Sequence, residues 1–240
     1  MISKEDRRDD LVFVTVSDVG SSHRILCIPN QDSAAFICDG EDYVLAVSDG
    51  VGSCKHADQG SSFATHACLK LFNGIKAHEI PFEDETIAET LISQWKERIT
   101  DNQFDEYCAT VKAVFKLGNQ VKIVSLGDGI AAISSDGIHM LSPSEEVSFL
   151  NETKCLSSHV SPDSIWIGDF RLDTQKTYVI FCCTDGVANG IVQGQIINLI
   201  EEIEKGTDSN YLRSELESLV TEIGNYCFDD KTIGVVKYER

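Results

Sequence analysis

The sequence predicts an α+β domain in which antiparallel β-sheets are covered by paired helices. Three observations lead to this prediction. Short apolar runs rich in β-branched residues recur along the chain, as is typical of strands. Four other stretches carry apolar residues at helical spacing and occur as two pairs. The order is strands, two helices, a long run of strands, two helices and a final strand, which differs from the βαβα alternation of a parallel sheet.

The predicted strands are apolar runs that are mostly four to eight residues long and end at Gly or Asp. Two Asp-Gly pairs, at residues 39–40 and 136–137, join adjacent runs and indicate hairpin turns. The runs span residues 11–16, 34–38, 43–47, 113–117, 121–126, 130–134, 178–183 and 232–236.

Each predicted helix has one apolar face, which we expect to pack on a sheet. No linker, repeat or low-complexity tract divides the chain, so we expect residues 1–240 to form a single domain. Residues 142–173 are the least regular stretch and indicate a long surface excursion. The four apolar faces comprise Ala64, Ala67, Cys68 and Leu71; Ile87, Leu91, Trp95 and Ile99; Val192, Ile196, Leu199, Ile200 and Ile203; and Leu212, Leu216, Leu219, Val220 and Ile223.

The charge balance excludes some partners and favours others. The chain has 39 acidic and 20 basic side chains, which gives a formal net charge of −19. This excess argues against binding to nucleic acid, which depends on Lys and Arg neutralising phosphates. It argues equally against an anionic membrane surface. Divalent cations are the natural partners of such a chain.

The cysteines and the first residues indicate a protein of a reducing compartment. Nine cysteines are an odd number, and neither a C-x-x-C pair nor a zinc-module spacing occurs among them. We therefore expect free thiols rather than a disulfide framework. Residues 1–10 are charged and lack the apolar segment of a secretory signal. We expect a cytoplasmic protein.

Three of the five Asp-Gly pairs follow strands that are apolar on both faces or nearly so. Asp49, Asp128 and Asp185 each follow, with one residue between, the runs 43–47, 121–126 and 178–183. Carboxylates that converge at one edge of a core repel one another, and a hard cation such as Mg²⁺ or Mn²⁺ removes that cost. A metal site and ordinary Asp-Gly turns both remain open from the spacing alone.

Six motifs, in order, resemble those of the metal-dependent serine/threonine protein phosphatases of type 2C, the PPM family. The similarity runs from about residue 16 to the C-terminus. Two short segments, residues 20–23 near its start and residues 151–153, resemble a compact bacterial branch of the family. The motifs are PNQDS at 29–33, AVSDGVG at 46–52, YCAT at 107–110, SLGD at 125–128, FCCTDG at 181–186 and DDKT at 229–232.

The resemblance implies a four-layer αββα sandwich with a dinuclear metal site at one end. By the motif match, Asp49 bridges two Mn²⁺ or Mg²⁺ ions and the Gly50 carbonyl binds one of them. Asp185 and Asp229 hold the first ion, and Asp32 holds the other through water. Asp128 matches the ligand of a weaker third ion. Asp230 stands where many members have Asn, so Asp229 is the expected ligand.

The chain departs from the family pattern at three places. Gln31 stands where the family often has an acidic residue, and Val51 replaces a histidine that is a candidate general acid in eukaryotic members. Many members also have an arginine for the substrate phosphate five or six residues before the Asp32 position, where this chain has Leu26 and Cys27. We expect His23 or Arg24 to take that role, with a surface pair as the alternative.

The resulting hypothesis is a Mn²⁺- or Mg²⁺-dependent phosphatase that hydrolyses phosphoserine and phosphothreonine in proteins with a metal-activated water. It implies a signalling role in which the phosphatase opposes a cognate Ser/Thr kinase, and we expect a monomer. Two alternatives stay open: a catalytically weak regulatory module on the same fold, and a hydrolase of small phosphoesters. By family analogy, residues 142–173 form a flap beside the site, where protein and small-molecule substrates are distinguished.

Overall fold

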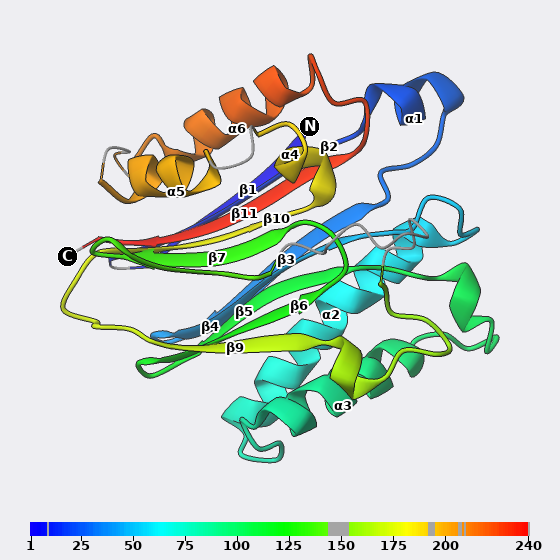
Figure 1. Cartoon of the computed structure of the whole chain (residues 1–240), viewed down its shortest axis with the longest axis horizontal. Helices are drawn as coiled ribbons and strands as arrows, with labels where there is room; N and C mark the ends of the chain where they lie inside the picture. Colours follow the sequence, from blue (N-terminus) through cyan, green and yellow to red (C-terminus); the bar gives the residue numbers. More distant parts are fainter. Residues whose placement is uncertain (9, 144–153, 192–194, 206–207, 209, 240) are drawn as a thin grey trace.

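The structure is a computed structural model that describes the chain except residues 9, 144–153, 192–194, 206–207, 209 and 240. Two antiparallel sheets stack face to face, and helices cover the outer face of each (Figure 1). These four layers confirm the predicted α+β fold and the αββα sandwich that the resemblance implies. Residues 144–153, the motif residues 151–153 among them, and Val192 lie outside the described part of the chain.

The first sheet has six strands in the order β1-β2-β11-β10-β7-β8. Every neighbouring pair is antiparallel. β10 lies inside this sheet, as its continuous apolar run predicts. The strands are β1 (Ile2–Arg8), β2 (Leu11–Asp18), β7 (Ile130–Ser135), β8 (Ile138–Leu141), β10 (Tyr178–Cys183) and β11 (Lys231–Tyr238).

The second sheet has five antiparallel strands in the order β3-β4-β5-β6-β9. β4 is buried on both faces: Val44 packs toward the helices, and Leu45 packs toward the first sheet. The strands are β3 (Asp32–Asp39), β4 (Asp42–Asp49), β5 (Val111–Leu117), β6 (Gln120–Leu126) and β9 (Trp166–Arg171).

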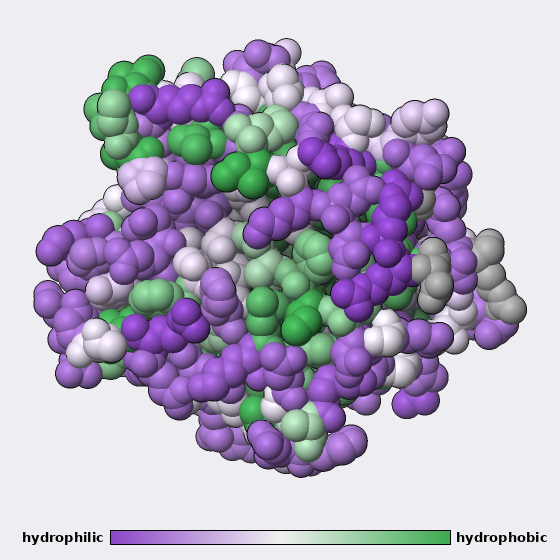
Figure 2. All heavy atoms as spheres, turned by 180° about the vertical axis from the view of Figure 1, so that it is seen from behind, coloured by the Kyte–Doolittle hydropathy of each residue, from purple (hydrophilic) through white to green (hydrophobic). Residues whose placement is uncertain are grey.

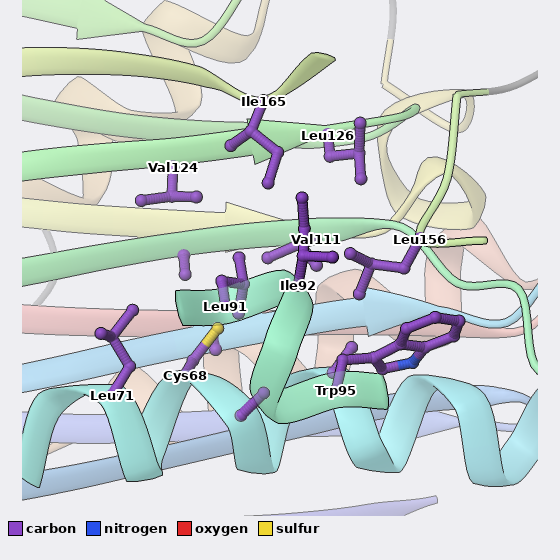
Figure 3. Packing of buried hydrophobic residues seen from close by; sticks show 14 of the residues in the cluster. Cys68, Leu71, Leu91, Ile92, Trp95, Val111, Val124, Leu126, Leu156 and Ile165 are labelled. Carbon is purple, nitrogen blue, oxygen red and sulfur yellow. The ribbon is translucent and has the colours of Figure 1, made fainter. Parts of the chain in front are cut away.

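The helix pairs cover the sheets as their apolar faces predict. α2 (Ala57–Lys76) and α3 (Asp84–Lys96) pack on the second sheet, where Trp95 and Leu156 lie in one apolar cluster (Figure 3). α5 (Ile196–Lys205) and α6 (Leu212–Ile223) pack on the first sheet. A third cluster fills the space between the sheets, so the two sheets form one core. No helix in the described part of the chain is long and apolar enough to span a bilayer.

Four elements differ from the sequence-based expectation. β1, β9 and the short helices α1 (Ser21–Leu26) and α4 (Asp185–Ala188) were not predicted. β9 pairs with β6 and occupies residues assigned to the surface excursion, which therefore does not extend unbroken to residue 173. Two 3₁₀ turns, η1 (Phe104–Glu106) and η2 (Pro162–Ser164), complete the described elements.

The face of the molecule seen in Figure 2 is mostly hydrophilic, in keeping with the charge. One hydrophobic area at the upper left of Figure 2 lies at the end of the molecule that carries α1. There Ile25 and Leu26 are 81% and 67% exposed.

Candidate functional site

Two aspartates face each other at one end of the β3–β4 pair. Asp32 begins β3 and lies directly opposite Asp49, which ends β4. Like charges in that position destabilise a strand pair, so the arrangement calls for a shared proton or a cation. Thr184 Oγ1 donates a hydrogen bond of 2.8 Å to Asp32 Oδ2. The buried Asp32 Oδ1 accepts no hydrogen bond from the described residues and is free to bind a metal ion or its water.

Three more aspartates come from neighbouring strand ends. Cys183 at the end of β10 lies opposite Ile233 of β11, so the residue after β10 and those before β11 are close together. Asp185 begins α4 just after β10, and Asp229 precedes β11. Asp128 lies in the turn between β6 and β7.

The pKa shifts show that these carboxylates interact. Burial, followed by the charges of Asp32, Asp185 and Asp229, raises the pKa of Asp49 well above its usual range. Burial also raises the pKa of Asp32, although the Thr184 hydrogen bond opposes the shift. For Asp185, burial and then the charges of Asp229 and Asp128 raise the pKa to about 6. The structure therefore brings together all five aspartates that the sequence singled out.

A surface depression of about 390 Å³ opens beside these carboxylates. Its walls combine carboxylates, backbone of the loop after β4, and residues of α1 and the loop before β11. The lining residues are Ser22, His23, Gln31, Asp49, Gly50, Gly52, Phe228 and Asp229.

Gly50 is required by close packing of the loop that follows Asp49. A Cβ atom at this position would lie 2.1 Å from the Ala57 carbonyl oxygen and 2.9 Å from that of Gln31. Gly50 N also donates to the Gln31 carbonyl at 3.0 Å. The loop is thus held between the start of α2 and the residue before β3, and only glycine fits there.

The donor chemistry of the site fits a hard divalent cation. Carboxylate, carbonyl and water oxygens are the ligands that Mg²⁺ and Mn²⁺ prefer. Within the described residues, no group of three or more His, Cys, Asp or Glu side chains is already arranged as a metal cage. Mg²⁺ keeps several waters and is commonly held by one or two carboxylates, so a closed cage is not required. The unpartnered Asp32 oxygen and the raised pKa of Asp49 are what such an ion would relieve.

Asp230, next to Asp229, has a different role. Its Oδ1 accepts a hydrogen bond of 2.6 Å from Gly20 N, and its Oδ2 accepts one of 2.6 Å from Gln31 N. Its Oδ2 also lies 2.9 Å from His23 Nδ1. Asp230 is therefore a buried anchor that ties β11 to α1 and to the start of β3. Because both carboxylate oxygens of Asp230 already have partners, Asp229 is the better metal ligand of the two.

His23 and Arg24 are separated by the structure. His23 is half-buried and lines the depression, where it contacts Asp230. Arg24 is exposed, bonds Asp18 at 2.5 Å and lines a different depression with Lys231. Of the two residues expected to bind phosphate, the geometry thus places only His23 beside the carboxylates.

Two buried lysines support the site and were missed by sequence reasoning. Lys112 Nζ donates to Ser125 Oγ at 2.6 Å and to the Gly127 carbonyl at 2.5 Å, beside Asp128. Lys231 Nζ donates to the Asp229 carbonyl at 2.6 Å. The sequence does contain a signal for such residues: each lysine lies in a strand that is largely apolar. A buried ammonium group needs hydrogen-bond partners, so a lysine at such a position indicates a polar contact.

Comparison with known proteins places this arrangement in a family context. The family model described as protein phosphatase 2C matches residues 19–220. No curated protein sequence matches the chain.

Solved bacterial structures share the fold at low sequence identity. RsbX in complex with magnesium is 15% identical with a TM-score of 0.67, and the match covers 99% of this chain and 100% of that one. The catalytic domain of the serine/threonine protein phosphatase PstP with two manganese ions is 17% identical with a TM-score of 0.65, covering 95% and 99%. The serine/threonine phosphatase Stp1 from Staphylococcus aureus is 16% identical with a TM-score of 0.68, covering 95% and 94%.

Proposed function

Because the chain belongs to the protein phosphatase 2C family, we propose that it is a Mn²⁺- or Mg²⁺-dependent phosphatase that hydrolyses phosphoserine and phosphothreonine in proteins. The observation that carries the proposal is the convergence of Asp32, Asp49, Asp128, Asp185 and Asp229 at one edge of the stacked sheets. The magnesium and the two manganese ions bound by RsbX and PstP support the choice of metals.

Each of these residues has a proposed task. Asp49 would bridge two ions, with the Gly50 carbonyl, Asp185 and Asp229 completing the protein ligands of one. Asp32 would hold the other through water, and Asp128 would bind a weaker third. When bound, the ions would lower the pKa of a water molecule and neutralise the charge of the phosphoryl oxygens.

The chain's own side chains prepare this site. The Thr184 hydroxyl favours the ionised form of Asp32, because its hydrogen bond lowers the pKa of that carboxyl. His23, on the wall of the depression, is positioned to contact a substrate phosphate. Val51 cannot donate a proton to a leaving group. General acid catalysis contributes about 10²–10⁴-fold, so we expect aryl phosphates to be better substrates than alkyl ones.

The test is turnover of p-nitrophenyl phosphate by the purified protein with added Mn²⁺. We expect EDTA and Asp49→Ala each to abolish it. Asp39→Ala is the matched control, because Asp39 ends the strand that Asp32 begins and lies far from the depression. Full activity without metal, or unchanged activity of Asp49→Ala, would reject the proposed metal site.

A regulatory module on the same fold is the second candidate, favoured by Val51 and Gln31 at positions where the family pattern has catalytic or acidic groups. It would bind Mn²⁺ in calorimetry but show no Mn²⁺-stimulated turnover of aryl phosphates or phosphothreonine peptides. Turnover of small phosphoesters without turnover of phosphopeptides would instead indicate a small-molecule hydrolase. A cognate kinase, a monomeric state and action in the cytoplasm are further parts of the proposal.

A further inference from the structure

Three thiols meet beside the loop that carries Gly50. The thiols of Cys54 and Cys108 both donate to the Asp105 carbonyl oxygen, at 3.1 and 3.4 Å. The Cys54 and Cys108 thiols also interact electrostatically with each other, as do those of Cys108 and Cys155. All three cysteines are free thiols.

The thiol cluster is attached to the candidate metal loop through the backbone. Val51 N donates to the Cys108 carbonyl at 2.9 Å, and Cys54 N donates to the Val51 carbonyl at 2.8 Å. Gly50 and Ala109 form a β-bridge. A change at Cys54 or Cys108 is therefore transmitted directly to the turn that follows Asp49.

The geometry favours one pair of the three. The antiparallel bridge between Ala109 and Leu156 puts Cys155 opposite Thr110, so Cys155 is a diagonal neighbour of Cys108. Side chains of diagonal neighbours lie farther apart than those of directly opposite residues. Cys54 comes from a turn, and its thiol shares the Asp105 carbonyl oxygen with the thiol of Cys108, which brings the two sulfurs to one atom.

We propose that Cys54 and Cys108 form a reversible disulfide when the protein encounters a peroxide. Cys54 is the more exposed and reacts first: its thiolate attacks one peroxide oxygen, the O–O bond breaks, and a water and a Cys54 sulfenic acid form. The sulfur of the buried Cys108 then attacks the sulfenic sulfur, the S–O bond breaks and a second water leaves. Two thiols lose two electrons and two protons, and hydrogen peroxide becomes two waters.

The disulfide alters the loop that carries Gly50. A covalent bond draws the two sulfurs closer than a hydrogen bond does, so the turn at residues 51–54 shifts toward Cys108. A displacement near 1 Å at a catalytic site costs about 10²-fold in rate. A loss of Mn²⁺-dependent turnover is therefore expected, and this expectation rests on the proposed phosphatase function.

The test is peptide mapping by mass spectrometry after treatment of the full chain with millimolar hydrogen peroxide. Burial and the contact with Cys108 raise the pKa of Cys54 to about 11, so the reaction is slow at neutral pH and is followed over hours. We expect a crosslinked peptide that contains Cys54 and Cys108, a fall in free thiols from nine to seven, and reversal by a dithiol reductant.

Single substitutions separate the assigned pair from its neighbour. Cys54→Ser and Cys108→Ser each abolish the crosslink, whereas Cys155→Ser, in the same cluster, retains it. A Cys108–Cys155 crosslink, or no crosslink in protein that remains folded by circular dichroism, would overturn the proposal. Because mapping does not depend on turnover, its result stands whether or not the protein is a phosphatase.

Discussion

Asp229 and Asp230 are neighbours in the chain but present their carboxylates to different surroundings. Asp230 accepts hydrogen bonds from the backbone N–H groups of Gly20 and Gln31 and contacts His23. Asp229 is exposed on the wall of the depression, and its carboxylate accepts a local hydrogen bond from Asp230 N at 2.9 Å. The same chemical change at the two positions should therefore affect different properties of the protein.

We expect Asp230→Asn to destabilise the protein and Asp229→Asn to weaken Mn²⁺ binding. An asparagine at 230 offers one acceptor oxygen where three donors converge, which costs about 1–3 kcal/mol of unfolding free energy. Urea unfolding in metal-free buffer measures the first effect, and calorimetric titration with Mn²⁺ measures the second. Equal losses of stability in the two variants would refute the distinction between anchor and ligand.

The hydroxyl of Thr184 offers a subtler test of the site, because it supports a ligand without being one. Thr184→Val removes the hydrogen bond to Asp32, which normally lowers the pKa of that carboxyl. We expect Mn²⁺ affinity to fall about 10–100-fold, as for other groups that orient a ligand. Thr221→Val on α6, whose hydroxyl donates to the Glu217 carbonyl one helical turn away, is the control. Equal affinity in both variants would remove Thr184 from the site.

Sequence reasoning found the aspartates of the site but not the groups that hold them. Asp49, Asp128 and Asp185 stand out because each follows an apolar strand, and that signal is local. The contact between Gly20 and Asp230 joins residues 210 positions apart, so no local pattern encodes it. The separation of His23 from Arg24 likewise depends on how α1 meets the loop before β11.

At the scale of elements, strands buried on both faces were predictable, whereas two of the four edge strands, β1 and β9, were not. β4 and β10 are continuous apolar runs with neighbours on both sides. β1 and β9 lie at the edges of their sheets. β1 has the sequence ISKEDRR, and its charged side chains discourage pairing with other chains. The same charges leave no apolar pattern from which the strand could be predicted. α1 and α4 have six and four residues, too few to show a helical period.

The loop between β4 and α2 gives a prediction at this scale. Gly50→Ala would force a Cβ atom to within 2.1 Å of the Ala57 carbonyl oxygen. We expect a loss of about 1–3 kcal/mol in unfolding free energy and a loss of Mn²⁺-dependent turnover. At Gly52 the nearest atom, Gln31 Oε1, is 3.5 Å from such a Cβ, so Gly52→Ala should retain stability. Thermal unfolding of both variants measures the difference in stability. A Gly50→Ala variant that is as stable as the original protein would contradict the close packing at this position.

For the whole molecule, placement of the acidic groups matters more than their number. The net charge of −19 favours cations in general, but two divalent ions would offset only a small part of it. Asp32, Asp49 and Asp185 differ from the surface carboxylates because burial and mutual repulsion raise their pKa values. They therefore bind protons more tightly in the folded than in the unfolded chain, and this links folding, pH and metal binding in one equilibrium.

The last prediction follows from the sign of that linkage. A carboxyl whose pKa is raised on folding stabilises the protein fully below its unfolded pKa, and that stability is lost as the pH rises through the folded pKa. The pKa values of about 6 for Asp185, about 7 for Asp32 and about 10 for Asp49, against an ordinary value of 3.8, place the loss between about pH 4 and pH 10. We expect the melting temperature of metal-free protein to fall across this range and added Mn²⁺ to restore it, most strongly at the alkaline end, where protons no longer compete for the carboxylates. Asp49→Asn, which removes a buried charge, should flatten the metal-free profile and abolish the Mn²⁺ effect. A metal-free melting temperature that rises steadily over the same range would mean that these carboxylates are not held together in the folded protein.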